Sequence, residues 1–288
     1  MDGDLRLGSP GLFVTGTDTD VGKTVVGCAI ARALRLTPVV DRSEGGGARE
    51  PRLARVGVCK PIASGCRRER EGLVNEDAEA LAHFADTDQP LDVVNPVRFR
   101  PAVTPAEAER VEGVSVDWSA VRRSLETIDA ASDVVMVEGA GGVLAPLSDG
   151  GGAVSGGGGA GGRALATTRG LVTVLDLMAW VGYPAVVVAR AGLGTINHTA
   201  MTVALLHQRG LRVAGVVMNG YIGDEAKQED DSMSTNRAWI ERMTGVPVLA
   251  TVPRVEGKVD PSRGLIDDAV LEAVAIGGPA GWVGRQAG

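Results

Sequence analysis

The residues with the clearest chemical potential lie near the N-terminus, in GTDTDVGKT at residues 16–24. A short apolar run precedes them and a segment of helical periodicity, residues 25–36, follows, which predicts a strand, a loop and a helix. In such a loop, backbone N–H groups face a polyphosphate, Lys23 brings an ammonium group to the β and γ phosphates, and the Thr24 hydroxyl is a ligand for Mg²⁺. Five residues, not the usual four, separate the two framing glycines, and Gly-Lys-Thr alone would also fit an ordinary turn. The strand-to-helix context favours nucleotide binding.

Lysine is rare in this chain, and two lysines fall in such motif segments. Of 29 basic residues, the only lysines are Lys23, Lys60, Lys227 and Lys258. Lys60 ends an apolar run and precedes Pro61, which stops a strand and keeps the residue before it extended. We therefore expect Lys60 at the carboxyl edge of a strand, where open α/β sheets bind ligands. A compact ammonium group can approach a phosphoryl group or a carbamate as a point charge.

Two carboxylates are candidates for a metal site. Glu138 follows four apolar residues, 134–137, and precedes the small residues GAGG. An unpaired carboxylate at the end of a buried strand is costly, so Glu138 should face a cation or hydrogen-bond donors, unless it only caps the following turn. Asp77 lies in the acidic first turn of a helix expected to begin near Asn75. It either favours the positive helix end or completes a Mg²⁺ shell, and the sequence leaves both readings open.

Two asparagines are further candidates for contact with a ligand. Asn197 lies in a glycine-rich helix start, residues 191–198, and either contacts a ligand or bonds only to its own turn. Asn219 follows an apolar run, residues 213–218, and either presents an acceptor and a donor to adenine or turns the chain.

The elements that must position these residues alternate along the chain. Apolar strands are expected to end near residues 16, 59, 137, 189, 218 and 252, and helices are expected at about 25–36, from 75, and at 117–131, 171–181, 195–209 and 265–275, with a polar helix before the last strand. Strands separated by helices predict an α/β fold with a doubly wound, mostly parallel sheet covered on both faces. We expect one domain over residues 1–288. Residues 1–10 should form a frayed lead-in, and residues 41–52 and 150–170, which are charged or glycine-rich, should be mobile insertions.

Composition excludes several classes of protein. The net charge of −7 argues against a general nucleic-acid or anionic-membrane surface. No signal pattern and no apolar run of bilayer length is evident, so we expect a cytoplasmic protein. The three cysteines have no metal-ligand spacing, and an odd number gives no disulfide framework.

Four blocks of sequence closely resemble the dethiobiotin synthetase family: residues 16–24, 60–65, 137–142 and 194–199. They occur in the family's order and extend across most of the chain. The resemblance implies a single doubly wound domain of the P-loop NTPase type, a homodimer, and an ATP-dependent reaction that joins CO₂ to 7,8-diaminopelargonic acid and closes a cyclic urea. The product, dethiobiotin, is the penultimate compound of biotin synthesis.

The resemblance also implies roles for individual residues. Lys60 would be the catalytic lysine beside Lys23, and Mg²⁺ would be bound by Thr24, Asp77 and Glu138. The substrate contacts would be Thr19, Ser64 and Asn197, the last reaching the diamine's carboxylate tail across the dimer. ATP would be contacted by Asp20, Val21, Gly22, Lys23, Thr24, Val25, Asp77, Glu138, Gly139, Ala140, Gly141, Asn219, Gly220, Pro253, Arg254 and Val255. This chain differs from the family pattern at Ala106, where a histidine is expected, and at Gly220.

The chemistry implied by the resemblance needs no side-chain nucleophile. An amine captures CO₂ as a carbamate, ATP phosphorylates it, and the second amine displaces phosphate, so the protein's task is mainly electrostatic positioning. Two other functions use the same fold. Partition-type switch ATPases typically carry a second lysine early in the loop, where this chain has TDTD at residues 17–20, and a regulatory module without turnover would not need intact Lys23, Lys60 and Glu138.

Overall fold

The computed structural model describes residues 5–40, 50–149, 170–222, 230–255 and 260–286. The insertions predicted at residues 41–52 and 150–170 lie almost entirely outside these ranges. Their mobility, and the assignment of the whole chain to one domain, therefore stay predictions. None of the described helices is both long and apolar enough to cross a bilayer.

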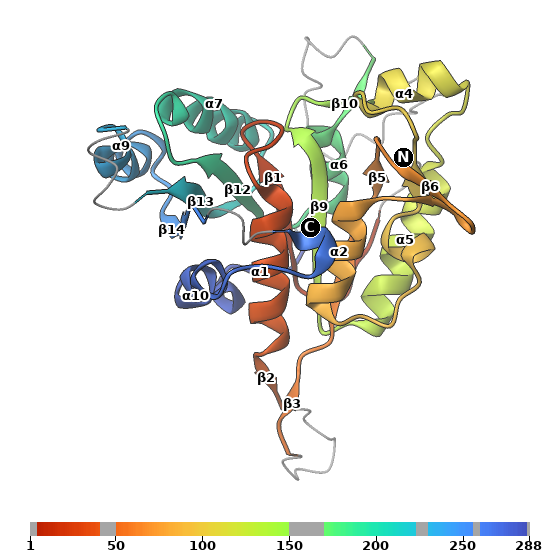
Figure 1. Ribbon diagram of the computed structural model, residues 1–288, viewed down its shortest axis with the longest axis horizontal. Helices are drawn as coiled ribbons and strands as arrows, with labels where there is room; N and C mark the ends of the chain where they lie inside the picture. The colour runs from red at the N-terminus through yellow and green to blue at the C-terminus, as the bar shows by residue number, and fades with distance from the viewer. Residues whose placement is uncertain (1–4, 41–49, 150–169, 223–229, 256–259, 287–288) are drawn as a thin grey trace.

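A six-stranded sheet forms the centre of the molecule (Figure 1). Its order is β14-β13-β12-β1-β9-β4, and every neighbouring pair is parallel. The strands are β1 (Gly11–Gly16), β4 (Val56–Cys59), β9 (Val134–Gly142), β12 (Ala185–Arg190), β13 (Val213–Tyr221) and β14 (Val248–Pro253). These are the six strands that the apolar runs predict, and the α/β fold class is confirmed.

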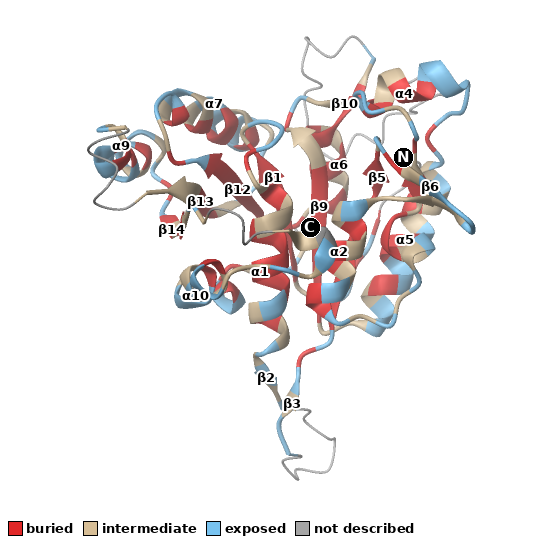
Figure 2. Ribbon diagram, in the orientation of Figure 1, coloured by how far each residue is buried: buried red, intermediate tan, exposed pale blue. Residues whose placement is uncertain are grey.

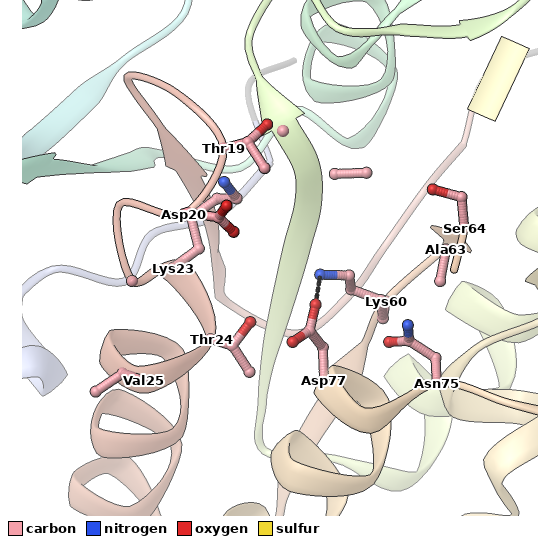
Figure 3. Close-up of a pocket in the computed structure, with 13 residues that line it drawn as sticks. Thr19, Asp20, Lys23, Thr24, Val25, Lys60, Ala63, Ser64, Asn75 and Asp77 are labelled. Carbon is pink, nitrogen blue, oxygen red and sulfur yellow. Dashed lines mark hydrogen bonds and ion pairs between the residues drawn. The ribbon is translucent and has the colours of Figure 1, made fainter. Parts of the chain in front are cut away.

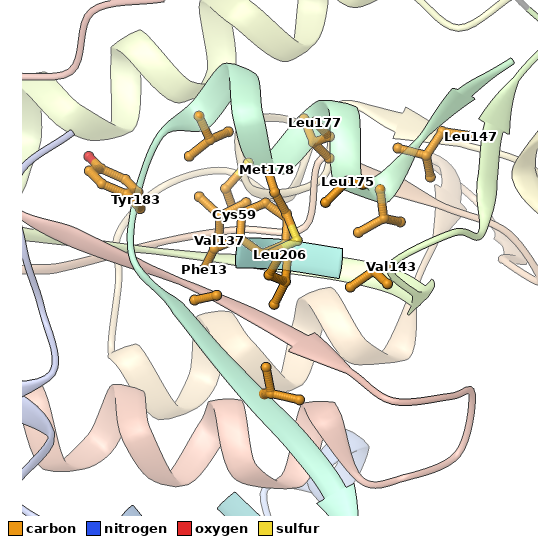
Figure 4. Close-up of a cluster of buried hydrophobic side chains, with 14 of the residues drawn as sticks. Phe13, Cys59, Val137, Val143, Leu147, Leu175, Leu177, Met178, Tyr183 and Leu206 are labelled. Carbon is orange, nitrogen blue, oxygen red and sulfur yellow. The ribbon is translucent and has the colours of Figure 1, made fainter. Parts of the chain in front are cut away.

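Helices cover both faces of this sheet. On one face lie α1 (Lys23–Arg35), α2 (Glu76–Ala85) and α10 (Asp268–Ile276); on the other lie α5 (Trp118–Ala131), α6 (Val174–Val181), α7 (Thr195–Gln208) and α9 (Met233–Thr244). Side chains of β1 alternate between the two cores: Leu12 and Val14 contact the α1 side, whereas Phe13 joins the cluster under α6 (Figure 4). Figure 2 shows the strands as the most buried part of the chain. Burial on both faces explains why these strands are continuously apolar in sequence.

Local sequence determines where several helices begin. Asn75 caps α2 by accepting a hydrogen bond from Ala78 N at 3.2 Å, and Asp117 caps α5 in the same way through Ala120 N at 2.8 Å. Such caps satisfy N–H groups that have no partner inside the helix. α6 begins at Val174, three residues later than predicted, because residues 172 and 173 first form a short strand.

Several smaller elements were not predicted from the sequence. Two are helices, α3 (Leu91–Val94) and α4 (Pro105–Glu112). The others are short strands and 3₁₀ turns, namely β2 (Pro38–Val39), β3 (Arg52–Leu53), β5 (Ile62–Ala63), β6 (Arg67–Glu69), β7 (Gly72–Val74), β8 (Val97–Arg98), β10 (Pro146–Ser148), β11 (Val172–Thr173), η2 (Pro261–Arg263) and η3 (Pro279–Gly281).

The prediction of a frayed lead-in is wrong for residues 5–10. Leu5 and Leu7 are buried, and Gln286 donates to the Leu5 carbonyl and accepts from Leu7 N. These contacts join the two ends of the described chain. The segment is therefore ordered by the burial of its two leucines and by hydrogen bonds to a residue at the other end of the chain.

Candidate active site

A cavity of about 230 Å³ opens at the carboxyl edge of the sheet (Figure 3). Three neighbouring strands, β1, β9 and β4, bring their carboxyl ends together here, as parallel pairing requires. Thirteen residues line the cavity: Thr19, Asp20, Gly22, Lys23, Thr24, Val25, Lys60, Ala63, Ser64, Asn75, Asp77, Ala140 and Gly141. Of the four sequence blocks that resemble the family, residues 16–24, 60–65 and 137–142 contribute to the lining, and residues 194–199 do not.

The loop between β1 and α1 has a conformation that its glycines permit. Gly22 caps α1 with φ of 90°, in the left-handed region, and a Cβ at this position would lie 2.0 Å from Asn219 Nδ2. Only glycine fits both the backbone angle and this close approach. Asn219 in turn donates to the Val21 carbonyl at 3.0 Å, which ties the loop to the end of β13. The loop is thus held by the end of β13, two strands away from β1 in the sheet, and presents the N-terminus of α1 to the cavity.

Lys60 makes the closest charged contacts in the cavity. Its Nζ lies 2.6 Å from Glu138 Oε1 and 2.7 Å from Asp77 Oδ2. The Lys60 side chain is 5% exposed and that of Glu138 is 0% exposed, whereas Asp77 is 43% exposed. Burial alone would lower the pKa of Lys60, but the two carboxylates outweigh it and raise that pKa, so this ammonium stays charged. The same ammonium holds the pKa of Asp77 below its ordinary value against the effect of burial.

Lys23 and Thr24 face this cluster from the first turn of α1. Lys23 Nζ donates to the Asp18 carbonyl at 2.8 Å, within its own loop. Burial, and next the positive charge of Lys60, lower the pKa of Lys23. Thr24 Oγ1 donates to Glu138 Oε1 at 2.9 Å. The two lysines therefore come from separate turns and reach one cavity, but they have different partners.

The residues present fit a divalent cation. Thr24, Asp77 and Glu138 offer hard oxygen donors, which Mg²⁺ prefers, and one cation, the Lys60 ammonium, already lies between the two carboxylates. Glu138 Oε2 is buried and has no hydrogen-bond partner in the part of the chain that the structure describes. Within those same ranges no group of three or more His, Cys, Asp or Glu side chains could hold a metal. A cation here would therefore depend on phosphate oxygens or water for its remaining ligands.

Most of the residues proposed for phosphate and substrate line the cavity. Glu138 does not line it but contacts Lys60 and Thr24, which do, and Val21 and Gly139 are buried outside the lining. A Cβ on Gly139 would lie 3.0 Å from Phe13 and Val174, so this glycine permits close packing of β9 on the core. Asn197 is exposed on α7 and does not reach the cavity.

The residues proposed for adenine lie together at a separate place. Asn219 pairs with Val252, and Tyr221 pairs with Pro253, across the β13–β14 ladder. Arg254 N then donates to the Tyr221 carbonyl at 2.8 Å. Gly220 and Val255 belong to the same two chain segments. This group lies beside the phosphate loop, because Asn219 contacts Val21.

Sequence reasoning missed three residues of the site. Ala63 and Asn75 line the cavity, and Asn75 had a signal, since asparagine before an acidic turn is a typical helix cap. Asn95 is buried, and its Nδ2 donates to the Lys60 carbonyl at 2.5 Å, while Lys60 N donates to the Val94 carbonyl at 2.8 Å. The backbone of Lys60 is thus held on both sides by one distant segment, for which the sequence carries no local signal.

Comparison with known proteins identifies the family. A family model described as an AAA domain matches residues 10–152 and 158–262. The ATP-dependent dethiobiotin synthetase BioD of Anaeromyxobacter dehalogenans is 40% identical over 243 residues, which cover 84% of this chain and 89% of that protein. The enzyme of the same name from Bacillus licheniformis is 33% identical over 246 residues, covering 85% and 86%.

One match among solved structures has a much lower sequence identity. The MinC–MinD cell division complex of Aquifex aeolicus matches with 14% identity and a TM-score of 0.49, covering 93% of this chain and 94% of that one, and this likeness bears on neither fold nor function. The matches to the two dethiobiotin synthetases, by contrast, cover 89% and 86% of those proteins. The chain belongs to the ATP-dependent dethiobiotin synthetase family.

Proposed function

We infer that this chain uses ATP to join CO₂ to 7,8-diaminopelargonic acid and to close the cyclic urea of dethiobiotin, in biotin biosynthesis. The observation that carries the inference beyond family membership is the convergence of Lys23 and Lys60 on one cavity. That cavity combines the N-terminus of α1 with two ammonium groups and with Asp20 and Asp77, and Glu138 contacts one of these ammonium groups. Such a site matches a reaction in which negative charge collects on phosphoryl and carbamate oxygens.

The reaction balances without a covalent enzyme intermediate. One amine adds to CO₂ and loses a proton to give a carbamate, the γ-phosphoryl group passes from ATP to a carbamate oxygen, and the second amine displaces phosphate as the ring closes and its proton leaves. We assign Lys23 and the N–H groups of its loop to the phosphates. We assign Lys60, at the other wall, to the carbamate and the transferring phosphoryl group, and Ser64 and Thr19 to the substrate.

We propose that Mg²⁺ is held by Thr24, Asp77 and Glu138 and that it neutralises charge on the β and γ phosphates when ATP is bound. Asn219, Gly220 and residues 253–255 are proposed to contact adenine. We also propose a homodimer, in which Asn197 of one subunit reaches the carboxylate tail of the diamine bound by the other. Because the reaction consumes ATP, we propose that it takes place in the cytoplasm.

The test is to incubate the purified chain with ATP, Mg²⁺, ¹³C-bicarbonate and diaminopelargonic acid and to measure products by mass. We expect dethiobiotin that carries one ¹³C atom and is formed in equal amount to ADP. Omission of the diamine should leave ATP largely unconsumed. ATP hydrolysis that proceeds equally with and without the diamine, and yields no labelled product, would instead favour a switch ATPase and contradict the proposal.

A further inference from the structure

We propose that Lys60 occupies the place of the divalent cation until that cation binds, and that the two exchange, which releases the Lys60 ammonium into the cavity. The inference rests on the proposed function, because it concerns the metal ligands and the lysine assigned to that reaction. It goes further by coupling the availability of Lys60 to the presence of the cation.

The oxygen atoms that Lys60 contacts are the ones a cation would need. Its Nζ lies 2.6 Å from Glu138 Oε1 and 2.7 Å from Asp77 Oδ2, and Thr24 Oγ1 is bonded to the same Glu138 oxygen at 2.9 Å. Two of the three proposed metal ligands, Asp77 and Glu138, therefore contact the Lys60 ammonium directly. The third, Thr24, contacts the Glu138 oxygen that accepts from it. Mg²⁺ binds oxygen at about 2.1 Å, so an ammonium and a divalent cation on the same oxygens would repel strongly at short range. The two occupants are mutually exclusive.

Because Glu138 is buried, exchange of the Lys60 ammonium for a divalent cation is more favourable than departure of Lys60 with no replacement. The Glu138 side chain is 0% exposed, and an uncompensated carboxylate at such a position is costly. Glu138 Oε2 already lacks a partner among the described residues, so Oε1 carries the whole interaction with the cation. Lys60 can therefore leave Glu138 only when another cation arrives. Asp77, which is 43% exposed, provides the side from which that cation can approach.

The released ammonium has space on the cavity side. Lys60, Ala63 and Ser64 line the cavity together, and Figure 3 shows the Lys60 amine joined to Asp77, with Lys23 and Thr24 at the start of α1. A flexible four-carbon stem allows the ammonium to move while the backbone stays fixed by Val94 and Asn95. The exchange therefore needs a change of side-chain rotamer and no change of fold.

The first test measures binding of Mn²⁺, as a spectroscopic probe for a divalent cation, to the full chain without substrates. Lys60→Met should bind Mn²⁺ at least about tenfold more tightly than the wild-type chain, since it removes the competing occupant. Lys23→Met is the matched control, because it removes an equal charge from the same cavity but no contact with Asp77 or Glu138. It should tighten binding by less than about threefold. Equal tightening by both variants would show a general charge effect and overturn the exchange.

The second test uses the wild-type chain and does not depend on the folding of a variant. Each of the four lysines lies in a different part of the sequence, so an amine-reactive acylating reagent followed by mass mapping reports on each one separately. Labelling of Lys60 should rise several-fold when Mn²⁺ is added, while labelling of Lys23 should not rise.

The outcomes separate this inference from the proposed function. Mn²⁺ that binds the wild-type chain without changing Lys60 labelling, and with the same affinity as in Lys60→Met, would refute the exchange but leave the metal site intact. Failure of Mn²⁺ to bind any of the three chains, with or without ATP, would refute the metal site itself and the exchange with it.

Discussion

Two carboxylates of the β9 segment have opposite surroundings. Asp133 immediately precedes the strand and accepts hydrogen bonds on both oxygens from the guanidinium groups of Arg52 and Arg55 and from Arg55 N, at 2.6–3.4 Å. Glu138, the middle residue of β9, accepts from Lys60 and Thr24 on Oε1 only. The side chain of Asp133 is 18% exposed, and that of Glu138 is 0% exposed. The more buried carboxylate is therefore the less satisfied one.

The difference separates a structural ion pair from a site built for chemistry. Hydrogen bonds from Arg52, the strongest influence, hold the pKa of Asp133 well below its ordinary value. Burial instead raises the pKa of Glu138, and Lys60 opposes that effect. A satisfied carboxylate stabilises the fold. An under-satisfied one beside a movable cation costs stability and is retained where a ligand completes it, as at many active sites.

The largest effect is expected at the phosphate loop. Lys23→Ala removes the ammonium that faces the phosphates, so both ATP affinity and dethiobiotin formation should fall, the latter by about 10³-fold. Calorimetric ATP titration and the ¹³C product assay measure the two quantities. Unchanged ATP affinity would place Lys23 outside the phosphate site. The cavity around Glu138 would then differ less from the structural ion pair at Asp133.

Glu138→Gln should lower product formation by about 10²-fold, because the amide is neutral and a poorer ligand for a divalent cation. The free energy of unfolding should change by less than about 2 kcal/mol, since Lys60 keeps Asp77 as a partner while a buried charge is removed. Urea unfolding measures the stability. A much larger destabilisation with normal turnover would make Glu138 a structural residue like Asp133.

Asp133→Asn should show the reverse pattern. Loss of its charge-assisted hydrogen bonds to Arg52 and Arg55 should cost about 1–3 kcal/mol of unfolding free energy. Turnover at a permissive temperature should stay within about twofold of wild type, because Asp133 lies at the edge of the sheet opposite the cavity. A proportionate loss of turnover would remove the distinction between the two carboxylates.

The smallest effect concerns pH. A carboxylate whose pKa is lowered in the folded state contributes stability that is complete above its unfolded pKa of about 4 and is lost as pH falls below it. The difference in unfolding free energy between the wild-type chain and Asp133→Asn should thus be constant from pH 8 to 5 and shrink toward pH 3. A difference that persists undiminished at pH 3 would mean that Asp133 acts through packing and not through its charge.

The sheet and most residues of the cavity lining could be predicted because their signals are local. Each central strand is a largely apolar run; Lys60 and Glu138 each follow such a run directly, and Lys23 follows one after the glycine-framed loop. Parallel pairing then brings them to one edge. Short strand pairs and α4 have no comparable apolar pattern, although proline at the first position of α4 was an available signal.

Partner choice could not be predicted. Lys60 pairs with carboxylates 17 and 78 residues away, and Arg52 lies 81 residues from Asp133. Arg52 also falls in the segment predicted to be a solvated loop, and its place in β3 corrects that prediction for this residue. Such pairings depend on how loops return to the sheet, which charge and hydropathy along the chain do not specify.

The most direct test of the central claim, that Lys60 acts in the chemistry and Lys23 in nucleotide docking, is to measure ATP affinity and ¹³C-dethiobiotin formation on the same sample of Lys60→Ala. The account predicts ATP affinity within about threefold of wild type and product formation reduced by about 10³-fold, since the Lys60 charge is used in the transition state more than in binding. Product formed at the wild-type rate, or a loss of ATP affinity as large as the loss of product, would contradict it.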